Sequence, residues 1–426
     1  MKSYHFIGIG GISMSALALE LKSEGNFVSG SDLKPTELTK KLESQGISVY
    51  YGHRRSNLRS ADFVIANGAI NVDNPEIKEA NLRGIKIKTR AELLGEVSRR
   101  YKNIIAVSGA HGKTTTTEMI AEIFIHAGKK PTVHIGGISK YFNSNLLLGK
   151  KKFFITEACE YKNSFLSLNP TTSVILNIER EHLDFFKTFA NVKKSFEKFE
   201  AKSKICVKLD KKRNIAYTKK LCVEGKNISH LGSGKYGYDA FCNNRYLGKI
   251  YLNAIGKHNV LNSLCAICVS LIYKIPFNKI SEALLNFKGV KRRYEIVSEN
   301  PLVVCDYAHH PTEIKKIILS TKRFTKNKII VAFQPHTYSR TKTLFSEFLT
   351  ALKLADEVHI IKTYSAREKF DPEASAKYLA ENLEGAHYHN SMKGAYNKIK
   401  ERLNSKCTLL ILGAGNIDEL AEMFSD

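Results

Sequence analysis

Several features are scarce or absent in this sequence of 426 residues. Eight cysteines are too few for a disulfide scaffold in a chain of this length, so we expect reduced thiols. No apolar run reaches about 18 residues, the length that a transmembrane helix needs. The opening stretch, MKSYHFIGIGG, lacks the ordered basic, apolar and small-residue regions of a secretory signal. These absences predict a cytoplasmic protein without membrane insertion.

A zinc site of the usual cysteine spacing is also missing. Cys265 and Cys268 form a C-x-x-C motif, but no second pair follows at the spacing of a zinc site. The surrounding LNSLCAICVSLIY is typical of one buried helix. We therefore interpret both residues as core thiols.

Acidic residues are outnumbered by basic ones, 41 to 66, which gives a formal net charge of +25. Such an excess suits a nucleic-acid partner, an anionic surface or acidic small substrates. The lysines are scattered along the whole chain, without the interleaving of arginine and aromatic residues that is typical of single-strand binding. We expect no nucleic-acid partner, and a nucleic-acid-dependent ATPase is an alternative that only the charge favours.

The chain is about three times as long as a usual domain. Short apolar runs alternate with helical patterns in three successive series, which is typical of parallel sheets with crossover helices. We predict an α/β protein of three domains, each with an open, mostly parallel sheet. They are a Rossmann-like domain (1–102), a P-loop ATPase-like domain (103–296) and a second Rossmann-like domain (297–426). Residues 200–255 show no pattern that we can assign.

A glycine loop follows the first strand of the central series, in the stretch SGAHGKTTTTEM (108–119). Gly109 and Gly112 let the backbone N–H groups turn toward phosphate oxygens, beside the positive end of the next helix. Lys113 would reach the terminal phosphates, and Thr114 would bind Mg²⁺. The loop is shorter than G-x-x-x-x-G-K-[ST], because Val107 stands where the first glycine of that motif belongs.

The stretch GIGGISM (8–14) joins a strand to a helix in the N-terminal series, and Asp32 ends the next strand. It is similar to a dinucleotide-binding fingerprint, but Ser13 stands in place of the third glycine. This imperfect match favours a bound diphosphate over NAD. A nicotinamide-dependent oxidoreductase is an alternative that leaves the SGAHGKTTTT stretch unexplained.

Polar side chains stand at further strand ends. Glu157 in FFITEACE and His182 in ILNIEREHLDFF could converge on the phosphate loop and hold a second Mg²⁺, since ligands of open α/β sheets bind beyond the carboxyl ends of the strands. In the last series, CDYAHHPTE and FQPHTYSR suit recognition of a carboxylate or phosphate. The residues that they offer are His309, His310, His336 and Arg340.

The chain resembles the Mur ligase family from about residue 4 to 417. The motifs that carry the resemblance are GIGGISM, SGAHGKTTTTEM, TEACEY, NIEREHLDFF, GKHNVLN, GVKRRYE, DYAHHPTE, FQPHTYSR and LGAGNI. The short phosphate loop is usual in this family, and folylpolyglutamate synthetases of the same superfamily share it.

The resemblance implies roles for particular residues. Lys113, Glu157 and His182 would be catalytic, and Thr114, Glu157 and His182 would bind the metal. The residues implied for ATP are Gly109, Ala110, His111, Gly112, Lys113, Thr114, Thr115, His258, Asn259, Asn262, Arg293 and Asp306. Those implied for the UDP-sugar and the amino acid are Gly10, Gly11, Met14, His53, His309 and Arg340.

The resemblance also implies an activity in peptidoglycan synthesis. ATP, with Mg²⁺, would phosphorylate the carboxylate of UDP-N-acetylmuramate, and the amine of L-alanine would attack the acyl phosphate. A recycling ligase that takes a preformed peptide is the nearest alternative, although its first loop typically departs from GIGG. Thr337 replaces an arginine that is common in the FQPH motif, which leaves Arg340 as the partner expected for the amino-acid carboxylate. The oligomeric state, monomer or dimer, stays open.

Overall fold

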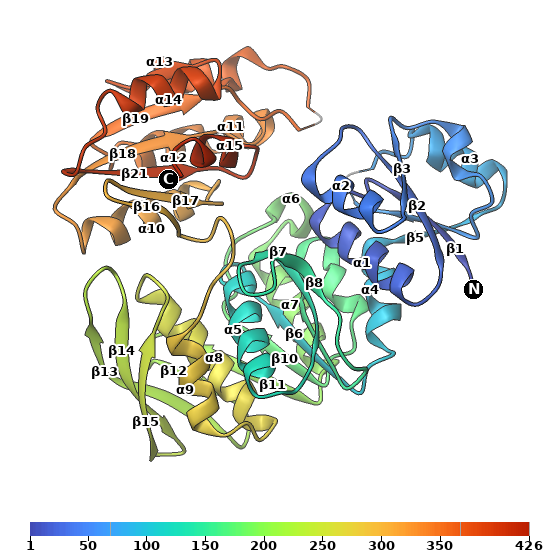
Figure 1. Cartoon of the computed structure of the whole chain (residues 1–426), viewed down its shortest axis with the longest axis horizontal. Coiled ribbons are helices and arrows are strands. Elements are labelled where there is room, and N and C mark those ends of the chain that lie inside the picture. Colours follow the sequence, from blue (N-terminus) through green and yellow to red (C-terminus); the bar gives the residue numbers. More distant parts are fainter. Residues whose placement is uncertain (69, 367, 426) are drawn as a thin grey trace. The chain divides into compact units, whose positions relative to one another are not determined.

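The computed structural model describes residues 1–68, 70–366 and 368–425, apart from the side chain of Asp184. The chain forms two compact units (Figure 1). The first contains residues 1–228, 237–253 and 258–289, and the second contains residues 229–236, 254–257 and 290–426. Between them the units hold three open sheets flanked by helices, which confirms the predicted fold class. The boundaries after residues 102 and 296 stay predictions.

The first sheet has five parallel strands in the order β3-β2-β1-β4-β5. The strands are β1 (Ser3–Ile7), β2 (Phe27–Asp32), β3 (Ser48–Tyr51), β4 (Phe63–Ala66) and β5 (Lys86–Thr89). The helices are α1 (Ile12–Ser23), α2 (Glu37–Ser44), α3 (Pro75–Leu82), α4 (Arg90–Ser98) and a 3₁₀ helix (Arg55–Leu58). Gly25 and Gly46 adopt positive φ just after α1 and α2, as expected of residues that end helices.

The central sheet has ten strands in the order β15-β14-β13-β12-β11-β10-β6-β9-β7-β8. Those at its centre, β11, β10, β6, β9 and β7, run parallel. The strands are β6 (Asn103–Ser108), β7 (Thr132–Ser139), β8 (Ser144–Leu147), β9 (Phe153–Glu157), β10 (Thr172–Ile175), β11 (Ile205–Asp210), β12 (Ile215–Tyr217), β13 (Cys222–His230), β14 (Tyr236–Cys242) and β15 (Arg245–Leu252). The unassigned region 200–255 thus supplies the β11–β15 side of the sheet.

Helices cover this central sheet. They are α5 (Lys113–His126), α6 (Leu183–Phe186), α7 (Phe189–Ala201), α8 (His258–Ile272), α9 (Phe277–Leu285) and a 3₁₀ helix (Tyr161–Ser167). Both α5 and α8 are buried along most of their length, which explains their apolar sequences. Cys265 and Cys268 are free thiols in the buried face of α8, as the sequence predicts.

The third sheet belongs to the second unit and has the order β16-β17-β21-β18-β19-β20, with only β16 antiparallel to its neighbour in the described pairs. Its strands are β16 (Glu295–Glu299), β17 (Leu302–Asp306), β18 (Lys328–Phe333), β19 (Glu357–Ile361), β20 (His387–His389) and β21 (Cys407–Leu412). The helices are α10 (Pro311–Lys322), α11 (Tyr338–Thr343), α12 (Phe345–Leu352), α13 (Ala376–Glu381), α14 (Met392–Lys400), α15 (Asp418–Glu422) and a 3₁₀ helix (Pro372–Ala374). Two apolar clusters line the sheet.

Within the first unit, one apolar core continues from the first sheet into the central sheet. A buried polar contact crosses it, because Glu20 on α1 bonds to His134 on β7 and accepts a hydrogen bond of 2.7 Å from the Tyr101 hydroxyl. The amide of Asn145 on β8 also donates to the Ser15 hydroxyl at 2.8 Å. These contacts join the two sheets into one body.

Within residues 1–68, 70–366 and 368–425, every helix is too short or too polar to cross a lipid bilayer.

The contact of Glu20 with His134 and Tyr101 leads to a test of stability. Replacing Glu20 by alanine leaves two buried polar partners unsatisfied, so we expect the free energy of unfolding to fall by about 3 kcal/mol. Glu24 is a matched control, since it is exposed and pairs with Arg100 and Lys151 at the surface. Its replacement by alanine should cost about 1 kcal/mol or less. Urea denaturation followed by circular dichroism measures both, and equal losses would contradict the role of Glu20.

Candidate active site

The loop between β6 and α5 has a conformation that only glycine suits at two positions. Gly109 has φ +140° and Gly112 has φ +84°. A Cβ atom on Gly112 would lie 2.8 Å from Oδ1 of Asn262, and one on Gly109 would lie 3.1 Å from the backbone nitrogen of Asn177. The glycines thus let the loop pack closely on α8 and on the end of β10.

Asn177, at the end of the strand beside β6, holds this loop in place. Its Oδ1 accepts a hydrogen bond of 2.9 Å from the His111 N–H, and its Nδ2 donates at 2.9 Å to the His111 carbonyl. Its carbonyl accepts from the Ala110 N–H at 3.3 Å. Contacts within the protein therefore hold the loop in its shape. Sequence reasoning did not identify Asn177, because its position beside the loop depends on the pairing of β10 with β6.

Lys113, the first residue of α5, folds back over the loop. Its Nζ donates to the carbonyls of Gly109 and Ala110 and pairs with the Glu160 carboxylate at 3.2 Å. Burial lowers the pKa of Lys113, but the charge of Glu160, its hydrogen bond and the neighbouring Cys159 and Glu157 together outweigh burial and raise it above its ordinary value. Lys113 is therefore a fixed cation at the start of the helix, where phosphate groups bind best.

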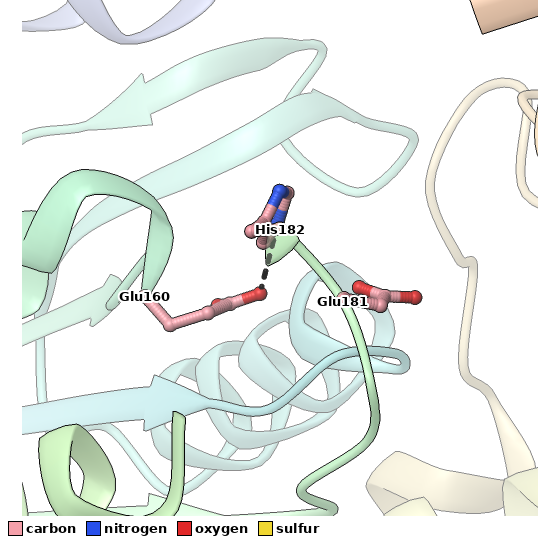
Figure 2. A group of neighbouring side chains, drawn as sticks. All are labelled: Glu160, Glu181 and His182. Atoms are coloured by element: carbon pink, nitrogen blue, oxygen red, sulfur yellow. Dashed lines mark ion pairs between the residues drawn. The ribbon is translucent and has the colours of Figure 1, made fainter. Parts of the chain in front are cut away.

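Glu160 also contacts His182, and Figure 2 shows the two side chains facing each other with Glu181 beside them. The distance from His182 Nε2 to the Glu160 carboxylate is 3.4 Å. Burial raises the pKa of Glu160, yet the hydrogen bond with His182 and the charge of Lys113 bring it below its ordinary value. One ligand atom of each of Glu160, Glu181 and His182 lies within 4.8 Å of the others, so this group fits a divalent cation.

Glu157, the predicted metal ligand, ends β9 three residues before Glu160. Its Oε1 accepts a hydrogen bond of 2.6 Å from the Gly136 N–H. Its charge contributes to the raised pKa of Lys113. Thr114 is buried and Thr115 half-buried in the first turn of α5. Sequence reasoning missed Glu160 and Glu181, although Glu160 follows the predicted Glu157 by three residues and Glu181 directly precedes the predicted His182.

The start of α8 lies beside the phosphate loop. Asn259 and Asn262 are buried there and share a hydrogen bond of 2.8 Å, and Asn262 faces Gly112. His258 is exposed at the first position of the helix. The structure thus brings Asn262 to the loop and places the other two predicted residues within the same turn.

In the first sheet, the GIGGISM loop is closed by Asp32. The Gly10 N–H donates to the Asp32 carboxylate at 2.8 Å, and Met14 is buried in the first turn of α1. Gly11 precedes α1 as its N-cap residue. Arg90 at the start of α4 donates to the Ser13 hydroxyl at 3.1 Å, and burial lowers its pKa although the charge of Glu157 acts in the opposite direction. Sequence reasoning missed this arginine, which joins α4 to the GIGGISM loop.

The imidazole of His53 contacts a buried carboxylate, that of Glu76. Its Nδ1 lies 3.2 Å from Glu76 and 3.0 Å from the Ser31 hydroxyl. Glu76 is fully buried and also accepts from Ser31 and Asn57, each at 2.6 Å. Contacts with Glu76 and Ser31, both in the first sheet domain, therefore determine the orientation of the His53 imidazole.

The second unit gathers its own predicted residues near the ends of β17 and β18. Asp306 is buried and accepts from the N–H groups of Tyr294 at 2.6 Å and Ala308 at 2.8 Å. Burial raises its pKa to about 6, although the nearby charge of Arg293 lowers it. The guanidinium of Arg293 lies 4.9 Å from the centre of the Tyr307 ring.

His309 and Arg340 both lie close to His336. The rings of His309 and His336 are 6.1 Å apart, and the Arg340 guanidinium bonds to the carbonyl of His336 at 2.5 Å. Burial, with the charge of Arg340, lowers the pKa of His336 to about 4, so the ring is neutral near pH 7. His310 instead caps α10 by accepting from the Thr312 N–H at 3.3 Å.

Comparison with known proteins gives three family models along the chain. Residues 3–102 match the Mur ligase family catalytic domain, residues 107–270 the Mur ligase middle domain, and residues 292–415 the Mur ligase glutamate ligase domain. A UDP-N-acetylmuramate–L-alanine ligase of Clostridium acetobutylicum is 40% identical over 445 residues, covering 99% of this chain and 97% of the relative.

Solved structures of Mur ligases are also similar to this chain along its whole length. A UDP-N-acetylmuramate-alanine ligase from Thermotoga maritima superposes with a TM-score of 0.85 at 29% identity, covering 100% of this chain and 98% of that one. A murein peptide ligase from Psychrobacter arcticus reaches a TM-score of 0.71 at 21% identity, covering 99% and 98% of the two chains, which shows a shared fold.

The strained loop geometry predicts the effect of Gly112→Ala. Alanine at φ +84° costs roughly 1 kcal/mol, and its Cβ would also push Asn262 away from the loop. We expect the affinity for an adenine nucleotide to fall about tenfold or more. Titration with a fluorescent ADP analogue measures this change. Gly128→Ala is the matched control, because Gly128 has φ +69° and nothing lies within 4 Å of an added Cβ. Equal affinities of the two variants would contradict the prediction.

Proposed function

Because the chain belongs to the Mur ligase family, we propose that it is a UDP-N-acetylmuramate:L-alanine ligase of peptidoglycan synthesis. The observation that carries this proposal is the 40% identity, over 99% of the chain, to a relative that bears this name. The phosphate loop with Lys113 supports the use of ATP. We propose a cytoplasmic location for the enzyme, as the sequence predicts.

The reaction needs an activated carboxylate, because an oxide ion is a poor leaving group. A carboxylate oxygen of the sugar acid attacks the γ-phosphorus of ATP, and ADP leaves. The amine of L-alanine then attacks the acyl carbon, an amide bond forms, and inorganic phosphate leaves as the nitrogen loses a proton. Lys113 would hold the phosphoryl oxygens while negative charge is spread over them.

Magnesium is proposed to bind through the Thr114 hydroxyl, Glu157 and His182, with Glu160 and Glu181 as further candidates. When bound, it would offset the negative charge of the phosphate groups. The grouping of Glu160, Glu181 and His182 within 4.8 Å supports a cation at this edge of the sheet. Lys113 pairs with one of these carboxylates, Glu160, at 3.2 Å.

The remaining predicted residues are proposed to bind the UDP-sugar, the amino acid and ATP. Gly10, Gly11, Met14 and His53 are proposed for the UDP-sugar in the first sheet domain, where Asp32 and Glu76 fix their surroundings. In the second unit, His309 and Arg340 are proposed for the amino acid. Further residues are proposed for ATP, and they are Gly109, Ala110, His111, Gly112, Thr115, His258, Asn259, Asn262, Arg293 and Asp306.

A test of the proposed function is phosphate release with ATP, Mg²⁺, UDP-N-acetylmuramate and a panel of amino acids. We expect release with L-alanine, little release without the sugar acid, and loss of release when EDTA removes the metal. A tripeptide offered in parallel distinguishes a recycling ligase. A folded protein that releases no phosphate with L-alanine would contradict the proposal.

The position of Lys113 predicts the effect of Lys113→Ala. Formation of ADP should fall by a factor of about 100 or more, because the fixed cation at the phosphates is lost. Binding of the UDP-sugar, measured by calorimetry, should change little, since its proposed residues lie in the first sheet domain. The exposed Lys212, in the turn between β11 and β12, provides a control, and Lys212→Ala should retain both properties. Loss of UDP-sugar binding in folded Lys113→Ala would contradict the separation of the two sites.

A further inference from the structure

Two glutamates of α5 are buried behind the phosphate loop and have no part in the proposed chemistry. Glu118 is fully buried and Glu122 is 2% exposed. Their spacing of four residues puts them on the same face of the helix. Burying carboxyl groups is costly unless hydrogen bonds satisfy them, so their partners indicate what the pair holds.

Glu122 holds the backbone at the end of the first unit. Both of its carboxylate oxygens lie 3.2 Å from the Lys288 N–H nitrogen, and Oε1 lies 3.4 Å from the Gly289 nitrogen. The Gly289 carbonyl accepts a hydrogen bond of 2.9 Å from the Lys140 N–H. Gly289 has φ +79°, and the second unit begins at the next residue, Val290. Lys288 and Gly289, the last residues of the first unit, are therefore bound by the Glu122 carboxylate and by the Lys140 N–H.

Glu118 accepts one hydrogen bond from the Ser139 hydroxyl, and the other contacts of that hydroxyl show that it is the donor. Ser139 Oγ accepts from the N–H groups of Tyr141 at 3.0 Å and Phe142 at 3.2 Å, so its own proton points to Oε1 of Glu118. The other oxygen of Glu118 has no donor among the described side chains and faces Glu122. Two carboxylates cannot bond to each other without a proton.

Geometry and burial place that proton on Glu118. Glu122 already accepts two N–H groups, whereas Oε2 of Glu118 has nothing to accept. Burial raises the pKa of Glu118 well above its ordinary value, and the negative charges of Glu122 and Glu157 add to this effect. Burial also raises the pKa of Glu122, to about 8, but the N–H groups of Lys288 and Gly289 and the contact with Glu118 limit that rise. Glu118 therefore donates to Glu122, and Glu122 remains the acceptor for the linker.

We propose that Glu118 and Glu122 share one proton and act as positioning residues that clamp the linker segment Lys288–Gly289 to the phosphate-loop helix. The inference rests on the proposed function for its kinetic consequence only. The clamped segment immediately precedes Arg292 and Arg293, and α5 begins with Lys113. Releasing the segment would lengthen the free chain at the junction without altering the phosphate loop.

Amide hydrogen exchange tests the clamp without any substrate. In the wild-type protein we expect the Lys288 and Gly289 amides to exchange as slowly as amides of ordered helices. In Glu122→Ala both acceptor oxygens are lost, so their exchange should accelerate about tenfold or more. Glu118→Gln should stay close to wild type, because its side-chain amide can donate to Glu122 as the proton does. Tryptic cleavage after Lys288 and Lys291 should follow the same order.

Glu282→Ala is the matched control, since Glu282 lies on α9, is half-buried and pairs with His126 and Lys279. Kinetics supply a second readout, because Glu122→Ala should lower kcat while the KM for ATP stays unchanged, and Glu118→Gln should retain kcat. Rapid exchange of Lys288 and Gly289 in the wild-type protein would overturn the proposal even if a variant fails to fold. Equal exchange in Glu122→Ala and Glu282→Ala would also overturn it. An inactive protein with a slowly exchanging linker would instead count against the proposed function.

Discussion

Parallel strands end at one edge of a sheet, and this constraint places nearly every residue of the candidate site. The GIGGISM loop follows β1 and Asp32 ends β2. The phosphate loop follows β6, Glu157 ends β9, and Asn177 stands just beyond β10. Asp306 ends β17 and His336 follows β18. Side chains that are far apart in sequence therefore meet at each edge without any further structural device.

Charge compensation shapes the edge of the central sheet. A buried ammonium group needs a carboxylate nearby, and Glu160 provides one for Lys113 while also pairing with His182. Asn177 meanwhile occupies the N–H groups of Ala110 and His111. A loop that is shaped by its own protein contacts loses less freedom when a triphosphate binds, which favours tight and specific binding.

The first unit couples two sheets by polar contacts inside an apolar core. Glu20, His134 and Tyr101 satisfy one another there, and Asn145 joins β8 to α1. Such contacts are directional, so they determine how α1 and the loop before it lie on the central sheet. The pair Glu118 and Glu122 uses the same principle at the other end of the unit, where it holds a backbone segment instead of a second sheet.

The sequence by itself determined the three α/β series, the phosphate loop and the residues at strand ends, because apolar periodicity and glycine position are local properties. It also determined the family, through nine motifs in order. Only the tertiary structure decided which side chains meet: Glu160 with Lys113, Asn177 with the loop, Arg90 with Ser13, and Glu122 with the linker. These pairings depend on strand order and on how helices pack, and neither can be read from a local pattern. For the same reason the strands of residues 205–252 escaped prediction: β11 continues the parallel part of the sheet, whereas β12 pairs antiparallel with both β11 and β13.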